Sequence, residues 1–298
     1  LFLVHQEGEI YTRGHHVWPY ESVESWLEDS IQVLEAEDVP YRRLTPKDLE
    51  HLYPQFHSPY IKEAILDLGA GFLEASKALS VLLTLCLRSG VQYYPNTRVT
   101  KIEPTVGGCR LYLEGKRKVR ADAAVVVING WTDDILSLPP KTLALAEQPL
   151  VYLTPRGKAS NLTPDHMPVF ISLNTDCYGF PLNNGAIKIA DDNPYRPINH
   201  PDERQEPEES YVNRVVETVS RFIPALKEAT IDRTHTCFYD RSKDGRFILD
   251  AWDEETRIVY GCGMSGRAFK FGPVIGERLA RFAVSGQRPP DLVNFRIR

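Results

Sequence analysis

Apolar residues recur along this chain with two spacings, which together predict a mixed α and β fold. Spacing of three and four residues predicts amphipathic helices over residues 23–36, 74–88, 208–222 and 273–283. Alternating or continuous apolar runs predict strands over residues 1–5, 64–68, 91–94, 99–103, 110–113, 118–120, 123–128, 149–154, 168–173, 177–181, 186–190 and 257–261. Thr45 before Pro46 predicts the N-cap and first position of another short helix.

The run at 123–128 differs from the other strands because it is continuous and β-branched. Such a run is typical of a parallel strand that is covered on both faces. Asn129, Gly130 and Trp131 follow it and precede a helix predicted near residues 132–136. A small residue beside glycine at a strand end lets the backbone approach a ligand closely, so we expect a binding role for Gly130 and Trp131.

A second glycine-rich turn joins the strand at 257–261 to the helix at 273–283, and it contains Gly263 and Gly266. Unpaired N–H groups in such a turn and at a helix amino end attract negative charge or an electron-rich ring. Lys270 stands just before the helix, where its ammonium group can reach a substrate carboxylate. The alternative is that Lys270 is an ordinary surface lysine after a glycine-rich loop.

Composition and charge narrow the classes of partner. The chain has 298 residues with 42% hydrophobic content, enough for one large domain or two intertwined ones. Its formal net charge of −5 favours neither nucleic acid nor an anionic membrane as a partner. The longest apolar run, 123–128, is too short to span a bilayer.

Five cysteines are present, an odd number with no CxxC pair. This pattern predicts a reducing compartment and no metal site. We expect an intracellular protein, cytoplasmic or peroxisomal, although the final residues Arg296-Ile297-Arg298 are not a peroxisomal signal.

Several short motifs resemble those of one flavoprotein family. They are Thr97-Arg98-Val99, residues 127–131, Tyr178-Gly179-Phe180-Pro181, Ala186-Ile187-Lys188, and Ser265-Gly266 with Phe269-Lys270-Phe271. Together with residues 237–298, they resemble the D-amino-acid-oxidase-like FAD-dependent oxidoreductases, in the branch of monomeric sarcosine oxidase, N-methyltryptophan oxidase and pipecolate oxidase. The resemblance extends over nearly the whole chain.

The resemblance implies a partial doubly wound FAD-binding domain interleaved with a large mixed β-sheet domain that binds the substrate. We assign residues 1–64 and 143–243 to the substrate domain, and residues 65–142 and 244–298 to the FAD-binding domain. By analogy, Cys237 bonds covalently to the flavin, Lys270 binds the substrate carboxylate, and Lys188 assists reaction with oxygen. Further cofactor-binding residues implied in this way are Val99, Gly130, Trp131, Gly263, Met264, Ser265, Gly266 and Phe269.

The chemistry of these residue types suits the roles. A thiolate can add to the electrophilic flavin ring, and a fixed cation favours electron transfer to oxygen. Tyr239, two residues after Cys237 on a predicted strand, shares its face and could line a substrate cavity with Tyr178. The alternatives are a Cys237 that is only a small buried apolar residue and a Tyr239 that belongs to the core.

Two positions depart from the family pattern. Gly266-Arg267-Ala268 stands where the family has Gly-His-Gly, and Asp192 stands where sarcosine oxidase has a histidine near the substrate. A permanent cation and a carboxylate there would change the preferred substrate charge, and the two could pair across a pocket. The alternative is that Arg267 and Asp192 both lie on exposed loops and have no role in a pocket.

The family's amino-terminal strand, G-x-G-x-x-G turn and helix have no counterpart in this chain. The chain opens with Leu-Phe-Leu-Val and no initiator methionine. Two explanations are open: a fragment of a full oxidase, or a natural short relative that lost the cofactor.

The first hypothesis is an FAD-dependent oxidase of a secondary amine or N-substituted amino acid, which yields an imine and hydrogen peroxide. Its partner is a small-molecule amine or amino acid. The second is a flavin-free relative that uses Lys188, Tyr178, Tyr239, Asp192 and Lys270 for acid–base chemistry such as cyclisation, isomerisation or dehydration. The third is a non-catalytic binding module.

Overall fold

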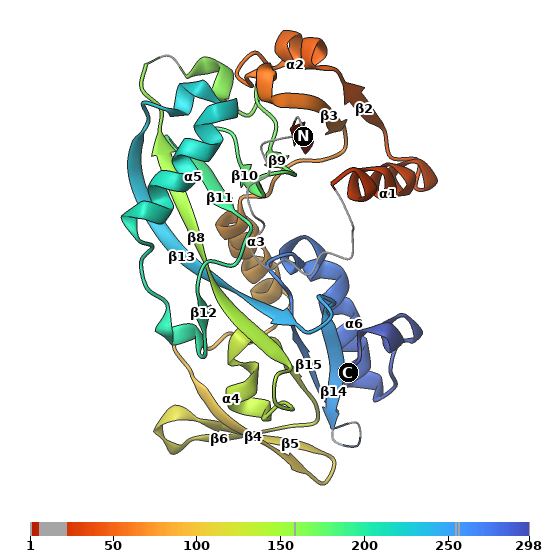
Figure 1. Ribbon diagram of the computed structural model, residues 1–298. Coiled ribbons are helices and arrows are strands. Elements are labelled where there is room, and N and C mark those ends of the chain that lie inside the picture. Colours follow the sequence, from red (N-terminus) through yellow and green to blue (C-terminus); the bar gives the residue numbers. More distant parts are fainter. Residues whose placement is uncertain (1, 6–22, 158, 254, 256, 298) are drawn as a thin grey trace. The chain divides into compact units, whose positions relative to one another are not determined.

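The computed structural model describes residues 2–5, 23–157, 159–253, 255 and 257–297, and Figure 1 shows its helices and strands. The helices in this part are α1 (Val23–Ala36), α2 (Pro46–Leu52), α3 (Ala75–Arg88), α4 (Thr132–Leu136), α5 (Glu209–Phe222) and α6 (Gly272–Ser285). The strands are β1 (Phe2–His5), β2 (Tyr41–Leu44), β3 (Ile61–Asp67), β4 (Val99–Thr105), β5 (Gly108–Leu113), β6 (Lys118–Ala121), β7 (Ala124–Val126), β8 (Leu143–Thr154), β9 (Phe170–Ser172), β10 (Cys177–Gly179), β11 (Ile187–Asp191), β12 (Pro197–Ile198), β13 (Thr230–Ser242), β14 (Ile248–Asp253) and β15 (Ile258–Cys262).

The predicted mixed α and β fold is confirmed, and so are the four long helices. The strand predicted at residues 91–94 is wrong: this segment has no regular structure. Gly90 ends α3 in the left-handed conformation, with φ of 84°. Tyr93 and Tyr94 then lie exposed, so no sheet face buries their rings.

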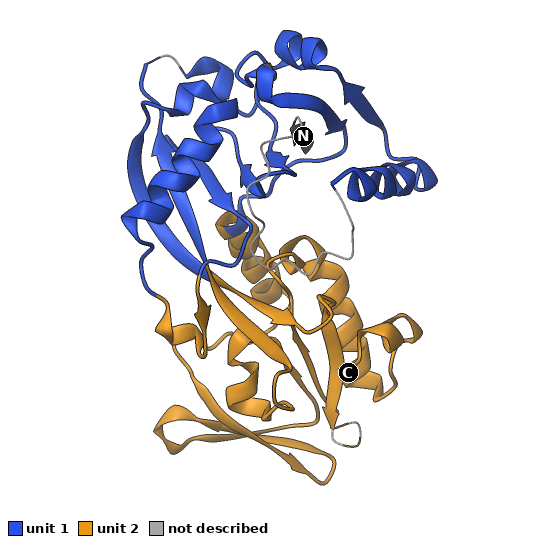
Figure 2. Cartoon of the chain, in the orientation of Figure 1, with its two compact units in different colours: residues 1–75, 148–195, 205–237 blue, residues 76–147, 196–204, 238–298 orange. Residues whose placement is uncertain are grey.

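The chain forms two compact units, coloured separately in Figure 2. Unit 1 contains residues 1–75, 148–195 and 205–237, and unit 2 contains residues 76–147, 196–204 and 238–298. The chain therefore crosses from one unit to the other several times.

Unit 1 is built on a mixed sheet in which β11, β10, β9, β1, β3 and β2 are neighbours in that order, with β8 next to β11 and β13 next to β8. β1 and β9 run parallel, whereas β10 and β11 run antiparallel. Helix α5 packs on this sheet through an apolar stripe, as its sequence predicts. The stripe and its sheet partners form one core of Val212, Val215, Val219, Phe222, Val151, Leu153, Ile187 and Ile189.

Unit 2 contains a sheet with the order β14-β15-β7 and an antiparallel sheet with the order β4-β5-β6. β15 is buried on both faces. Val259 packs with Leu279 and Phe282 of α6, while the other face belongs to a core with Ile102, Cys109, Leu136, Ile258, Tyr260 and Cys262. This alternation follows directly from the two-residue period of a strand.

The prediction for residues 123–128 is confirmed in part. β7 runs parallel to β15, with Tyr260 opposite Val126. Coverage of both faces is not seen, because Val125 and Val127 are exposed. Within the described residues β7 has β15 as its single strand neighbour, so it is an edge strand there.

The first residues of α2 allow a test of the local prediction. The Thr45 side chain accepts a hydrogen bond from Asp48 N, and the Asp48 carboxylate accepts one from Thr45 N at 2.9 Å. Thr45→Ala should lower the free energy of unfolding by about 1 kcal/mol, measured by urea denaturation. Thr84→Ala on the exposed face of α3 is the matched control and should be neutral or slightly stabilising. Equal stability of both variants would contradict the capping role.

Candidate active site

Two turns lie at the same edge of the parallel strand pair in unit 2. Residues 129–131 form a short 3₁₀ helix (Asn129–Trp131) soon after β7, and the glycine-rich turn starting at Gly263 directly follows β15. Parallel strands point their carboxyl ends to one edge of a sheet, where α/β proteins bind ligands. Gly263, Ser265 and Gly266 have φ of 67°, 49° and 71°, which is the conformation that a sharp turn requires. The predicted glycine-rich turn is therefore present.

Asp240 of β13 holds this turn. Its carboxylate accepts hydrogen bonds from Gly263 N at 2.7 Å and Met264 N at 3.0 Å, and its carbonyl accepts one from Ser265 N at 2.9 Å. These three amide groups are thus already paired, which corrects the expectation that unpaired N–H groups of this turn face a ligand. The side chain is 1% exposed, and this burial raises the pKa of Asp240 to about 6, although the amide donors favour the charged form.

Asp240 is not among the site residues that the sequence predicts. Along the second half of β13, Thr236, Phe238, Asp240 and Ser242 are buried, while the intervening residues are half-buried. A lone carboxylate on the inward positions of a strand was the available signal, because such a group needs paired donors.

The intervening positions of β13 include Cys237 and Tyr239, which therefore share a face as predicted. The Tyr239 ring lies directly against Gly266: a Cβ placed on this glycine would come 2.2 Å from a ring carbon. Glycine is required at 266 both by its φ and by this close approach. Tyr239 thus packs on the turn that carries Arg267.

Gly130 is glycine for a packing reason. A Cβ there would come 2.8 Å from the Phe238 ring and 3.0 Å from both Leu145 and Pro201, so protein side chains fill the space. The Trp131 indole N–H donates to Asp202 at 3.2 Å, and its ring packs edge-on against Phe238. The proposed cofactor roles of Gly130 and Trp131 remain predictions. Val99 lies at the start of β4, opposite Leu113 of β5. Its proposed cofactor role likewise remains a prediction.

Lys270 lies in a 3₁₀ helix (Ala268–Phe271) that leads directly into α6. Arg267, Phe269, Lys270 and Phe271 are all exposed, and the Lys270 ammonium is 5.9 Å from the centre of the Phe271 ring. A short segment of unit 2 therefore presents two cations and two aromatic rings together. Such a segment can contact a flat ring or a carboxylate.

Lys188 lies in unit 1 on β11, where the sequence predicted a strand, opposite Tyr152 of β8. Its ammonium group is half-buried and lies 4.0 Å above the Phe180 ring. Burial lowers the pKa of Lys188, while the nearby Cys237 thiol raises it to a smaller extent. Both residues belong to unit 1.

Aromatic rings surround the Lys188 side. Phe180 contacts Tyr178 and Phe72 edge-on, with ring centres 6.2 and 6.1 Å apart. Tyr178 and Phe180 are half-buried, so both keep part of their surface in solvent. Asp192 is half-buried, and its backbone N–H donates to the Asp176 carbonyl at 3.0 Å. Asp192 belongs to unit 1, whereas Arg267 belongs to unit 2.

The described residues contain no cluster of histidine, cysteine or acidic side chains arranged to hold a metal ion. Among the helices described, none has the length and apolar character to cross a membrane. All five cysteines are free thiols, and Cys237 is half-buried.

Comparison with known proteins identifies the family. The family model described as FAD dependent oxidoreductase (DAO) matches residues 3–282. The chain belongs to this family. N-methyl-L-tryptophan oxidase of Yersinia pestis (strain Pestoides F) is 26% identical over 278 residues, which cover 91% of this chain and 72% of that protein.

Solved structures share the fold of this FAD dependent oxidoreductase. L-proline dehydrogenase from P. horikoshii has a TM-score of 0.79 at 18% identity, covering 98% of this chain and 73% of its own. NikD, an amino acid oxidase essential for nikkomycin biosynthesis, has a TM-score of 0.77 at 20% identity, covering 100% of this chain and 76% of its own. The predicted fold class and the predicted family are both confirmed. The chain spans about three quarters of the length of these proteins.

FAD is the cofactor of this family, and the residues of this chain fit it at two places. In unit 2 the fit rests on the glycine turn at the carboxyl edge of parallel strands, followed by the exposed rings and cations of residues 267–271. In unit 1 it rests on the ammonium of Lys188 beside the Cys237 thiol.

The buried carboxyl of Asp240 predicts a pH dependence of stability. Its folded pKa of about 6 exceeds the ordinary value of 3.8, so between these values the folded protein holds a proton that the unfolded chain has released. The contribution of Asp240 to the free energy of unfolding therefore decreases as pH rises through this window. Asp240→Asn should flatten the dependence by roughly 2–3 kcal/mol between about pH 4 and 6.5, measured by urea denaturation at several pH values.

Asp122→Asn, at an exposed position, is the matched control and should leave the pH dependence as in the unchanged protein. If the free energy of unfolding of Asp240→Asn still decreases with pH as in the unchanged protein, another group binds this proton.

Proposed function

We propose that this chain acts in the FAD-dependent oxidation of a secondary amine or an N-substituted amino acid. The observation that carries the proposal is the half-buried Lys188 ammonium, held over the Phe180 ring beside the Cys237 thiol. The name of the relative N-methyl-L-tryptophan oxidase supports the substrate class. In addition, we assign unit 1 chiefly to the substrate domain and unit 2 chiefly to the FAD-binding domain.

FAD when bound accepts a hydride from the carbon beside the amine nitrogen and passes the two electrons to oxygen, which takes up two protons to form hydrogen peroxide. The substrate loses that hydride and one N–H proton and leaves as an imine, which water hydrolyses. The chain's own residues bind and orient the substrate. Lys188 supplies a fixed positive charge where negative charge develops, and its partial burial strengthens that effect.

Lys270 is proposed to bind the substrate carboxylate. The ammonium is exposed and belongs to the short segment between the glycine turn and α6. Arg267 is a second cation on the same segment and favours an acidic substrate. Tyr178 and Tyr239 are proposed to line the substrate cavity, and Asp192 to set which substrate charge is preferred.

The roles proposed for the remaining residues concern the cofactor. We propose that the exposed segment from Gly266 to Lys270 and the residues Val99, Gly130, Trp131, Gly263, Met264 and Ser265 hold FAD, and that Cys237 forms a covalent bond to it. Addition of the thiolate to the oxidised flavin would make this bond: the flavin carbon would lose a hydrogen as a proton, and the two electrons would reduce the flavin and then pass to oxygen, which forms hydrogen peroxide. Purified protein with the visible absorbance bands of a flavin supports the proposal, whereas a colourless protein that is catalytically active would eliminate it.

Lys270→Met should raise KM for a carboxylate substrate by about 10- to 100-fold, because one charge-assisted hydrogen bond contributes about 1.5–3 kcal/mol. Steady-state peroxide production over a range of substrate concentrations measures this. Lys243→Met, another exposed lysine of unit 2, is the matched control and should leave KM unchanged. An unchanged KM in Lys270→Met would refute the assignment.

Cys237→Ser should release flavin into the supernatant when the protein is precipitated with acid, while the unchanged protein keeps flavin in the pellet. Cys86→Ser, at an exposed cysteine, is the control and should behave like the unchanged protein. Flavin that stays in the pellet of the Cys237→Ser protein would place the covalent bond at another residue.

A further inference from the structure

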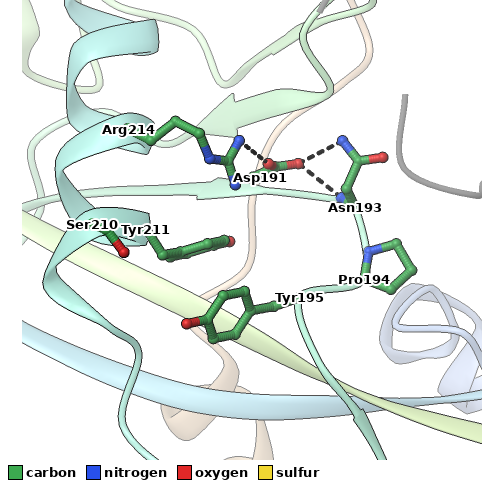
Figure 3. A pocket seen from close by; sticks show the side chains of 7 residues that line it. All are labelled: Asp191, Asn193, Pro194, Tyr195, Ser210, Tyr211 and Arg214. Atoms are coloured by element: carbon green, nitrogen blue, oxygen red, sulfur yellow. Dashed lines mark hydrogen bonds and ion pairs between the residues drawn. The ribbon is translucent and has the colours of Figure 1, made fainter. Parts of the chain in front are cut away.

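Unit 1 contains a pocket of about 320 Å³ between the end of β11, the segment that follows it and the first turns of α5. Figure 3 shows the side chains around it. The pocket is lined by Asp191, Asn193, Pro194, Tyr195, Ser210, Tyr211 and Arg214.

This pocket is on the helix side of the sheet and is separate from the Lys188 group. Side chains of a strand alternate between the two faces, so Asp191 shares a face with Ile187 and Ile189, and Lys188 points to the opposite one. Ile187 and Ile189 are fully buried in the core that includes α5. A ligand in this pocket would therefore not touch Lys188.

The Asp191 carboxylate is already engaged within the protein. Its buried carboxylate accepts from Asn193 N at 2.9 Å, from Asn193 Nδ2 at 2.7 Å and from one Arg214 nitrogen at 2.9 Å. Arg214 also balances its charge, so the carboxylate neither needs a cation nor leaves the pocket negatively charged.

Two buried side-chain atoms of the pocket have no hydrogen-bond partner among the described residues: the Tyr211 hydroxyl and Asn193 Oδ1. The Tyr211 hydroxyl is buried and has no hydrogen-bond partner among the described residues, and its side chain is 5% exposed. Burial raises the pKa of Tyr211 and the Asp191 charge adds to the effect, so the hydroxyl keeps its proton and can donate it. Figure 3 shows this hydroxyl pointing to the middle of the lining side chains.

Arg214 provides further donors beside that hydroxyl. Its guanidinium group lies 5.0 Å from the centre of the Tyr211 ring and donates one hydrogen bond, to Asp191. A guanidinium group has five N–H donors, and the Arg214 side chain is 52% exposed, so several donors are accessible to a ligand. The missing partner of the Tyr211 hydroxyl is therefore an acceptor, and beside the Arg214 cation an oxyanion suits that place best.

Two aromatic rings and a proline form one wall of the pocket. The Tyr195 and Tyr211 rings are 4.3 Å apart between centres, and Pro194 extends this wall. We propose that this pocket binds a small carboxylate with an aromatic body, whose oxygens accept hydrogen bonds from the Tyr211 hydroxyl and the Arg214 guanidinium. The aromatic body would pack on Tyr195 and Pro194.

Phenylacetate is the probe, and isothermal titration calorimetry with the full chain is the measurement, which does not require flavin. Tyr211→Phe should weaken phenylacetate binding by about 10-fold, because it removes one hydrogen bond to a charged acceptor. This change also removes an unsatisfied buried hydroxyl, so folding should not suffer. Arg214→Lys keeps a charge for Asp191 but loses the forked donor geometry, and should weaken binding as well.

Tyr53→Phe, a half-buried tyrosine packed on the same core but outside the pocket, is the matched control and should bind phenylacetate like the unchanged protein. Binding that is lost in Lys270→Met and retained in Tyr211→Phe would overturn the proposal, as would the absence of saturable binding. Equal affinity for the neutral phenylacetamide, or binding of inorganic phosphate in place of phenylacetate, would overturn the assignment of an aromatic carboxylate.

Discussion

The hydrogen bonds from the glycine turn to Asp240 are the interaction on which the candidate site of unit 2 depends. One buried aspartate joins β13 to the turn that follows β15: its carboxylate accepts from two successive amide groups and its backbone carbonyl from the third. The Tyr239 ring, next along β13, then packs on Gly266. Asp240 and Tyr239 are neighbours in sequence, so β13 positions the start of the segment that carries Arg267 and Lys270. The cost of burying the carboxylate is visible in its raised pKa.

A similar balance operates at Lys188 in unit 1. Partial burial disfavours its ammonium form, and the Phe180 ring at 4.0 Å offsets part of that penalty without neutralising the charge. A carboxylate partner would have stabilised the ammonium more but would have cancelled its field. The role proposed for Lys188 needs a positive charge, and an aromatic partner preserves that charge.

The sheet of unit 1 separates two kinds of chemistry by the alternation of β11. Lys188 lies on one face, whereas Asp191 on the other face pairs with Arg214 of α5. The α5 side therefore has its own polar cluster, in which the Asp191 carboxylate accepts three hydrogen bonds while the Tyr211 hydroxyl and Asn193 Oδ1 have no partner among the described residues. One short strand can thus serve two binding sites whose ligands do not meet.

The sequence by itself determined the four long helices, most of the strands, the family and the identity of Lys188, Cys237 and Lys270 as candidates, because periodicity and local motifs act over a few residues. The α2 cap, the α5 stripe and the shared face of Cys237 and Tyr239 follow from such local rules. The tertiary structure alone decided what lies opposite each side chain. Three features depend on contacts between distant segments. Asp240 pairs with a turn 23 residues later, the Phe238 ring occupies the space beside Gly130, and the Tyr211 hydroxyl is buried without a hydrogen-bond partner among the described residues. No local pattern encodes such contacts, since they arise only when strands and helices pack together.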